Sequence, residues 1–152
     1  MKLRLFPLSA PASASVYPGL ELLAAAVLML RPDERVCYVN PAAENLFELS
    51  RPKFMGHTPR EIFGDCAALE AAIAKAVTSG ASYTEQEIEL GVAGKARLHL
   101  TCTVSPIETP DATLLIEFRH IDQQLKVARE ERLQQQQQAN RDLIRSLAHE
   151  IK

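Results

Sequence analysis

The sequence predicts an α+β fold in which an antiparallel sheet is followed by a long helix. Two strand signals come first, several short helices follow, and three strand signals come last. Strands grouped in this way pair antiparallel, because they do not alternate with helices as in a parallel sheet. Residues 122–152 contain neither glycine nor proline, as an uninterrupted helix requires. At 152 residues, the chain is long enough for one domain and a short appendage.

The composition narrows the class of protein. Hydrophobic residues make up 47% of the chain, which excludes a wholly disordered protein. A net charge of −2 provides no general basic field for nucleic acid. The three cysteines, Cys37, Cys66 and Cys102, are far apart and form no CxxC pair. We therefore expect buried thiols in a reducing compartment, and neither a disulfide framework nor a zinc site.

The N-terminal residues lack the features of a secretory signal. Residues 1–4 carry positive charge, but the apolar stretch that follows, residues 5–8, is short and contains a proline. The longest apolar run, Leu22 to Leu30, is too short to cross a bilayer. We expect a flexible tail over residues 1–19 and a cytoplasmic protein.

The folded region is predicted to open with a β-hairpin. Residues 26–30 are all apolar, as in a buried strand, and residues 35–39 have the composition of a second strand. Pro32 and Asp33 between them are typical turn residues. The two strands are expected to pair antiparallel across this turn.

Two short helices are predicted from capping residues that precede a proline. Asn40 is a favourable N-cap, and the proline after it fits the first helical position, so a helix is expected as far as Phe47. Thr58 is also followed by proline, which predicts a single helical turn that ends at Phe63.

An alanine-rich segment, residues 67–78, predicts a longer helix. Leu69, Ile73 and Val77 recur at helical spacing, so we expect all three to pack in the core. Gly80 is placed to end this helix as its C-cap.

Three strands are predicted after this helix, over residues 83–90, 95–104 and 112–120. The first two alternate between apolar and polar residues, as half-exposed antiparallel strands do. Residues 91–94 and 109–111 contain the glycine, proline and aspartate typical of turns.

The last predicted element is a helix over residues 122–152, with Asp122 as its N-cap. At about 100° per residue, apolar side chains gather on one stripe of its final turns. The members of this stripe are Leu143, Ile144, Leu147 and Ile151. Asn140 interrupts the stripe with a polar group, as in many coiled coils. Because a lone amphipathic helix is unstable in water, we expect it to pair with a second copy in a homodimer.

His149 lies on the opposite side of this helix, about 200° from Leu147. Arg145 and Lys152 share its side, and Glu150 follows it in sequence. A neutral imidazole offers one unprotonated nitrogen as a nucleophile, a carboxylate can hold the other N–H, and nearby cations favour phosphate. The pattern fits a phosphoacceptor, although on periodicity alone an ordinary surface histidine is the simpler interpretation. No second histidine completes an HExxH zinc motif.

The segment from Asp142 to Lys152 closely resembles the H-box of sensor histidine kinases, in the form found in the NtrB-type nitrogen-regulation kinases. The segment 36–43, in which a strand runs into Asn-Pro-Ala, resembles the N-terminal PAS domain of these kinases. Further matches in the short helices that follow are Gly56, Thr58, Pro59, Ile62 and Phe63. The resemblance covers residues 20–152.

This resemblance implies a PAS sensor domain over residues 20–121, with a five-stranded antiparallel sheet and short helices on one face. Residues 122–152 would form the signalling helix and the beginning of the dimerisation and histidine phosphotransfer domain.

The resemblance also implies an activity and partners. His149 would be the phosphoacceptor and Glu150 the acid that polarises it. In this family the histidine is phosphorylated from Mg-ATP, and the phosphoryl group passes to the response regulator NtrC, which the kinase also helps to dephosphorylate. The PII signal protein biases that choice according to nitrogen status. The boxes that bind Mg-ATP would lie beyond residue 152, so we expect no kinase activity from this chain alone, and no direct contact with nucleic acid or membrane.

A second hypothesis is a PAS module that binds a ligand and has a purely structural coiled-coil helix. A photochemical flavin site would need a cysteine in the family's Asn-Cys-Arg setting, which Cys66 lacks. A haem would need an axial ligand, but His57, His99 and His120 fit structural or surface positions better. We therefore expect no cofactor in the PAS domain.

Overall fold

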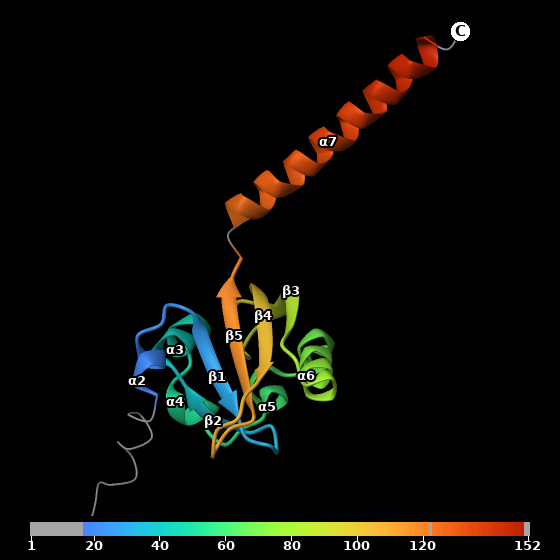
Figure 1. Cartoon of the computed structure of the whole chain (residues 1–152). Coiled ribbons are helices and arrows are strands. Elements are labelled where there is room, and N and C mark those ends of the chain that lie inside the picture. Colours follow the sequence, from blue (N-terminus) through green and yellow to red (C-terminus); the bar gives the residue numbers. More distant parts are fainter. Residues whose placement is uncertain (1–16, 122, 151–152) are drawn as a thin grey trace, which may run out of the picture. The chain divides into compact units, whose positions relative to one another are not determined.

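The computed structural model describes residues 17–121 and 123–150 (Figure 1). The chain divides into two compact units, the first ending at His120 and the second beginning at Ile121. The first unit holds a sheet and short helices. The second contains the long helix α7, Gln123–Glu150.

All neighbouring strands of the sheet are antiparallel, in the order β2-β1-β5-β4-β3. In chain order they are β1 Ala26–Leu30, β2 Val36–Val39, β3 Tyr83–Leu90, β4 Leu98–Pro106 and β5 Leu114–His120. The first strand pairs with both β2 and β5, so the N-terminal hairpin joins the C-terminal strand in the middle of the sheet. The predicted five-stranded antiparallel sheet is confirmed.

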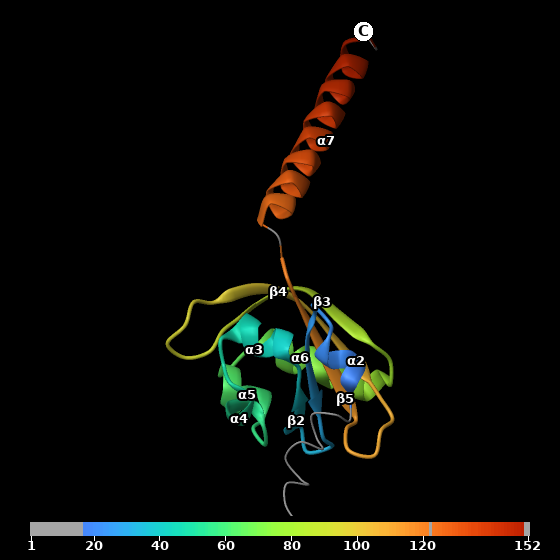
Figure 2. The same ribbon diagram turned by 90° about the vertical axis from the view of Figure 1, so that its left-hand side faces the viewer.

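The two faces of the sheet are covered by different helices (Figure 2). The main core lies between one face and helices α3 to α6. These helices are α3 Pro41–Phe47, α4 Arg51–Phe54, α5 Pro59–Phe63 and α6 Ala67–Ser79. On the other face, a smaller cluster with Val27, Met29 and Tyr38 packs against Tyr17 and Leu20, at helix α2, Pro18–Glu21. Strand β1 is buried on both faces, which explains its uninterrupted apolar sequence.

Asn40 connects three segments of the first unit. It is fully buried, and it is the only polar residue in the core of the part of the chain that the structure describes. Its Oδ1 accepts hydrogen bonds from the N–H groups of Ala43, at 3.0 Å, and Val27, at 2.9 Å. Its Nδ2 donates to the carbonyl oxygens of Leu20, at 3.0 Å, and Ala25, at 2.9 Å. The predicted N-cap of α3 is confirmed, and the same side chain also fixes α2 and the start of β1.

The other predicted helix ends are also found. Thr58 begins α5 with a capping box, in which its Oγ1 accepts from the N–H of Glu61 and the Glu61 carboxylate accepts from the N–H of Thr58. Gly80 ends α6 in the left-handed conformation, with φ of 68°.

The prediction that Val77 packs in the core is wrong, because its side chain is 59% exposed. The buried face of α6 consists of Leu69, Ala72, Ile73 and Ala76. These four positions repeat at i, i+3, i+4 and i+7 and share one side of the helix, which Val77 only borders. Two alanines and two larger side chains, Leu69 and Ile73, therefore form the contact with the rest of the core.

Two strands begin later than predicted, because turn hydrogen bonds occupy their first backbone groups. The N–H of Lys95 donates to the carbonyl of Val92 at 3.0 Å, within the turn, and β4 starts at Leu98, which pairs with Leu90. The N–H of Ala112 donates to Oγ1 of Thr109 at 2.9 Å, so β5 starts at Leu114. A backbone N–H committed to a turn is not free to join the ladder.

Helices α2 and α4 have no counterpart among the predicted elements. Each has four residues and a proline in its first turn, which is too short for a periodic apolar pattern. Residues 18 and 19, predicted to belong to the flexible tail, are part of α2. Residues 1–16 of that tail and the predicted N-cap Asp122 lie outside the described residues.

Asn40→Ala is expected to lower the free energy of unfolding by about 3 kcal/mol or more, because it removes a helix cap and leaves buried backbone groups without partners. Urea unfolding measures this change. Ser50→Ala is the matched control, because Ser50 is the N-cap of α4 but makes no capping hydrogen bond. It should change the stability by less than about 0.5 kcal/mol. Equal losses in the two variants would contradict the role given to Asn40.

Candidate functional site

Helix α7 exposes an apolar stripe along one side. The side chains involved are exposed by half or more: Leu133 by 54%, Leu143 by 59%, Ile144 by 67% and Leu147 by 50%. Asn140 lies on the same stripe, seven residues from both Leu133 and Leu147, which is the spacing of a coiled-coil seam. We call Leu133, Asn140, Leu143, Ile144 and Leu147 the α7 seam. The predicted stripe member Ile151 lies outside the described residues.

Apart from Val127, which is 48% exposed, and a few alanines, the described side chains on the rest of α7 are polar, and its sequence includes the five consecutive glutamines 134–138. Over residues 17–121 and 123–150, no helix combines the length and apolar character needed to cross a bilayer.

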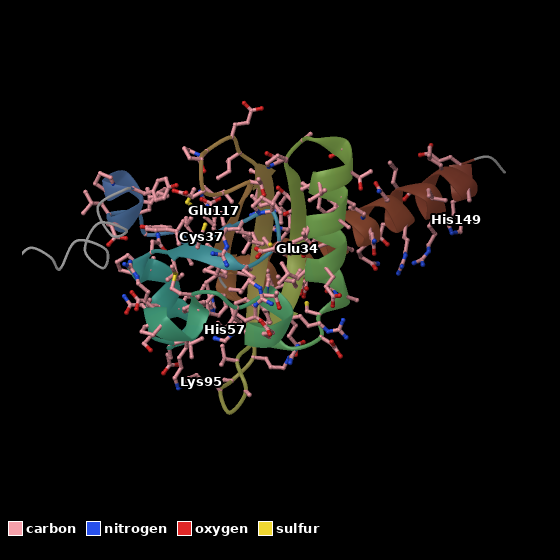
Figure 3. The ribbon with its side chains drawn as sticks, turned by 90° about the horizontal axis from the view of Figure 1, so that it is seen from below. Glu34, Cys37, His57, Lys95, Glu117 and His149 are labelled. Carbon is pink, nitrogen blue, oxygen red and sulfur yellow. The ribbon has the colours of Figure 1, made fainter. Side chains whose placement is uncertain are left out.

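His149 lies near the end of α7 and is exposed (Figure 3). At about 100° per residue it is about 200° from Leu147, on the side opposite the α7 seam. Arg145, one turn earlier, shares that side and is also exposed. Asp142 lies on the same side and accepts a hydrogen bond from Gln138 at 3.2 Å. The imidazole and a nearby guanidinium therefore share one face of the helix, away from the apolar stripe. Lys152, expected beside them, lies outside the described residues.

Glu150 is exposed at the end of α7, adjacent in sequence to His149. Consecutive residues on a helix point in directions about 100° apart, so they do not face each other. Within the described residues, no hydrogen bond or ion pair joins the Glu150 carboxylate to the His149 ring. A contact between them therefore requires side-chain conformations other than those of this helix.

The interior of the first unit, between the helices and the sheet, is filled by aromatic side chains. Phe47 of α3 packs against Phe63 of α5 and Phe118 of β5, with ring centroids 4.8 and 5.2 Å apart. Phe54 of α4 also packs against Phe47, with the ring centroids 6.3 Å apart. All four rings belong to the buried core. Aromatic packing thus occupies the middle of this unit.

The histidines considered as haem ligands lie on different elements. His57 is half exposed, and its Nδ1 is 3.7 Å from the Glu61 carboxylate, in the turn before α5. His99 lies in β4, opposite Glu89 of β3, and His120 is exposed at the end of β5. These three side chains lie on separate elements and are exposed or partly exposed, so the structure does not bring them together as a site.

The cysteines are free thiols, and only Cys102 is fully buried. Burial raises the pKa of the Cys102 thiol to about 12. The expectation of three buried thiols is wrong for Cys66, which precedes α6, and for Cys37, which lies on the edge strand β2. Cys37 packs against the smaller cluster with Val27, Met29 and Tyr38 but stays partly exposed.

A polar cluster that the sequence patterns did not reveal fastens α2 to the sheet. The Tyr38 hydroxyl donates a hydrogen bond to the Glu21 carboxylate, and an Arg51 guanidinium nitrogen lies 3.3 Å from the same carboxylate. Arg51 also donates to the carbonyl of Val39 at 2.9 Å. Burial and the Glu21 carboxylate raise the pKa of the Tyr38 hydroxyl. The three side chains are up to 30 residues apart in sequence, so no local motif connects them.

Comparison with known proteins identifies the first unit. A family model described as the PAS fold matches residues 20–126. The crystal structure of the PAS domain of nitrogen regulation protein NR(II) from Vibrio parahaemolyticus is similar, with 32% sequence identity and a TM-score of 0.61. The match covers 74% of this chain and 99% of that domain.

Similar sequences extend over most of the chain. The sensory histidine kinase/phosphatase NtrB of Vibrio alginolyticus is 37% identical over 128 residues, which are 84% of this chain and 36% of that protein. NtrB of Escherichia coli O157:H7 is 29% identical over 126 residues, which are 83% of this chain and 35% of that protein. The chain thus spans about a third of the length of these relatives.

Proposed function

Because the chain belongs to the PAS-fold family and is similar over most of its length to NtrB sensory histidine kinases, we propose that it is the sensing and dimerisation region of such a kinase. In this proposal residues 20–121 form the sensor domain, and residues 122–152 begin the phosphotransfer domain. The observation that carries the proposal is the 37% identity to an NtrB kinase over 84% of the chain. The exposed His149-Glu150 pair at the end of α7 supports it.

The proposed reaction at His149 is transfer of the γ-phosphoryl group of ATP. An unprotonated ring nitrogen attacks the phosphorus, the bond to the oxygen that bridges to the β-phosphate breaks, and ADP leaves. Arg145 lies one turn away on the same face, where a guanidinium can stabilise negative charge on the transferred group. The solvent-facing position of His149 leaves the ring accessible to a separate ATP-binding domain.

Mg-ATP would be bound by another part of the kinase. In the described residues, no cluster of three or more histidine, cysteine or acidic side chains could hold a metal ion. The chain spans about a third of the length of its NtrB relatives, and we propose that it accepts the phosphoryl group but does not transfer it from ATP by itself.

Glu150 is proposed to orient the His149 ring. Its carboxylate would accept a hydrogen bond from the second ring N–H and so fix the tautomer whose other nitrogen attacks. Because the two side chains do not touch in α7 as described, this hydrogen bond would form when the phosphoryl donor and the surrounding domain order the end of the helix.

We propose for the whole kinase the partners that the resemblance to this kinase family implies. These are the response regulator NtrC, to which the phosphoryl group passes and which the kinase also dephosphorylates, and the PII signal protein, which reports nitrogen status. A cytoplasmic location is proposed because all three cysteines are free thiols, which persist in a reducing compartment.

We propose that two copies of the chain pair along the α7 seam, because an isolated amphipathic helix is unstable in water. Leu133, Leu143, Ile144 and Leu147 are exposed by half or more, and a parallel second copy would cover them. Asn140 favours a parallel pair in register, because its amide then meets the identical amide of the partner. In such a pair both His149 side chains point away from the contact.

We propose that the PAS domain holds neither flavin nor haem, because aromatic side chains fill its interior. Phe47, Phe54, Phe63 and Phe118 occupy the space between the helices and the sheet. The purified protein should therefore show no absorption band in the visible region. A band that stays with the protein through gel filtration would contradict this expectation.

Incubation of the chain with Mg-ATP and the ATP-binding domain of an NtrB relative should place an acid-labile phosphoryl group on His149. His149→Gln should abolish the label while leaving the fold intact, because residue 149 is exposed and lies opposite the α7 seam. Glu150→Gln should slow labelling by about 10²-fold or more, since a side chain that holds or moves the proton of a reacting group typically contributes 10²–10⁴-fold. Labelling is followed with radioactive ATP, and the site is located by mass spectrometry.

The matched control for these variants is His120→Gln, which changes an exposed histidine in the first unit and should leave the label unchanged. An acid-labile label that persists in His149→Gln would place the acceptor elsewhere. No label in the unchanged chain, although the same ATP-binding domain labels its own relative, would favour the alternative of a PAS ligand-binding module with a structural helix.

A further inference from the structure

Two turns lie next to each other at the end of the sheet where β1 ends and β5 begins (Figure 1). One turn joins β1 to β2, and the other joins β4 to β5. The N–H of Thr113 donates to the carbonyl of Leu30 at 2.9 Å, so a backbone hydrogen bond connects the two turns.

A hollow of about 720 Å³ opens between these turns and the edge strand β2. Cys37 of β2, labelled in Figure 3, borders it, and each turn contributes one charged residue, Arg31 or Asp111. The rest of the lining is mostly apolar and consists of Tyr17, Pro32, Val36, Met55, Gly56 and Pro110. Sites for small molecules have volumes of about 300–1,000 Å³, apolar walls and a few polar groups. This hollow has all three features.

The two charged groups have opposite signs and lie close to the same thiol. Burial raises the pKa of the Cys37 thiol, the Arg31 guanidinium lowers it, and the Asp111 carboxylate raises it again. An ion shifts the pKa of a neighbouring group appreciably only from a short distance. The Cys37 sulfur also lies 3.8 Å from the backbone carbonyl oxygen of Asp111. A cation and an anion therefore border the part of the hollow that Cys37 faces.

Neither charged group has its hydrogen-bonding capacity filled. The Nε of Arg31 lies 3.6 Å from the Asp33 carboxylate, and the guanidinium donates no hydrogen bond within residues 17–121 and 123–150. Over the same residues the Asp111 carboxylate has no ion pair and accepts no hydrogen bond. Both groups are thus available to a ligand in the hollow.

This pair of charges selects one class of small molecule. A guanidinium pairs with a carboxylate, and a carboxylate pairs with an ammonium group. An α-amino acid carries both a carboxylate and an ammonium group on one carbon atom. A dianion would meet the Asp111 carboxylate, and a dication would meet the Arg31 guanidinium, so each would gain one attraction and one repulsion. The apolar walls favour an apolar side chain on the amino acid.

We propose that this hollow binds an α-amino acid with an apolar side chain, whose carboxylate pairs with Arg31 and whose ammonium group pairs with Asp111. The side chain lies against Val36 and Met55. The bound molecule joins the β1–β2 turn to the β4–β5 turn. Every group involved belongs to the first unit, so the proposal does not depend on phosphoryl transfer to His149.

L-leucine is the probe, added to the complete chain. It should slow the alkylation of Cys37 by iodoacetamide, which mass spectrometry follows. At ten times the dissociation constant of L-leucine the rate should fall by about fivefold or more, because the reagent reaches the thiol only while the hollow is empty. Cys66 is the internal control, since it is also a partly exposed free thiol but does not line the hollow, and its rate should not change.

The dissociation constant is measured from the shifts of backbone amide signals in nuclear magnetic resonance spectra. Arg31→Gln and Asp111→Asn should each weaken L-leucine binding by about three- to fivefold, as the loss of one partly exposed ion pair does. The matched controls are Arg60→Gln and Glu108→Gln, since both residues are exposed but neither lines the hollow. They should leave the dissociation constant unchanged.

Two analogues of leucine assign each charge to its partner. Isocaproate lacks the ammonium group, so Asp111→Asn should not weaken its binding, whereas Arg31→Gln should. Isoamylamine lacks the carboxylate, so the two variants should have the reverse effects on it.

The proposal is overturned if L-leucine moves no amide signal around the hollow, or if it slows Cys37 and Cys66 equally. It is also overturned if isocaproate or isoamylamine binds as tightly as L-leucine, because the hollow would then not recognise both charges. None of these outcomes bears on the labelling of His149.

Discussion

The arrangement of the first unit depends on the four hydrogen bonds of one buried amide. Asn40 follows β2 and is the N-cap of α3. Its side chain is hydrogen bonded to Val27 in β1, and to Leu20 and Ala25, which precede that strand. These bonds fix where β1 begins, and β1 fixes the register of β5 through its pairing with that strand. Strand β5, the last strand of the chain, ends at His120, where the first unit also ends.

A polar group in an apolar core is costly unless each of its donors and acceptors is paired. In Asn40 every donor and acceptor of the amide is paired, since its oxygen accepts two hydrogen bonds and its nitrogen donates two. An aspartate would keep the two accepted bonds but lose the two donated ones, and a leucine would lose all four. The position therefore requires an asparagine and not merely a good helix cap.

Local signals in the sequence were sufficient for the parts of the fold that local chemistry decides. The Asn40 and Thr58 caps, the Gly80 helix end and the alternation of the later strands were predicted, and the structure confirms them. The extra bonds of Asn40 were not predictable, because they join it to segments 13 to 20 residues away.

The features that the sequence did not predict correctly also depend on contacts between segments that are far apart in the chain. Val77 follows the apolar spacing of its helix but falls at the border of the face that meets the sheet, and only the position of the sheet decides this. The cluster of Glu21, Tyr38 and Arg51 comes from three separate segments. For the candidate site, helical periodicity placed His149 opposite the apolar stripe. The contact between Glu150 and His149 was implied by the family resemblance alone, and consecutive helical residues, about 100° apart, do not face each other.

The two sides of α7 have different roles in the proposed kinase, one in pairing and the other in phosphoryl transfer. One side carries the α7 seam, and the other carries His149 and Arg145. This separation allows the helix to pair with a second copy without covering the acceptor. In the proposed dimer the α7 seam therefore faces the partner, and His149 faces away from it.

Pulsed electron paramagnetic resonance distances between the two copies test this claim most directly. A spin label is attached to a cysteine at residue 136, on the seam side, or at residue 138, on the side of His149, after Cys37, Cys66 and Cys102 have been replaced by alanine. The distance between labels at residue 138 should exceed that between labels at residue 136 by at least one helix diameter, about 10 Å. Equal distances, or a shorter distance at residue 138, would contradict the claim.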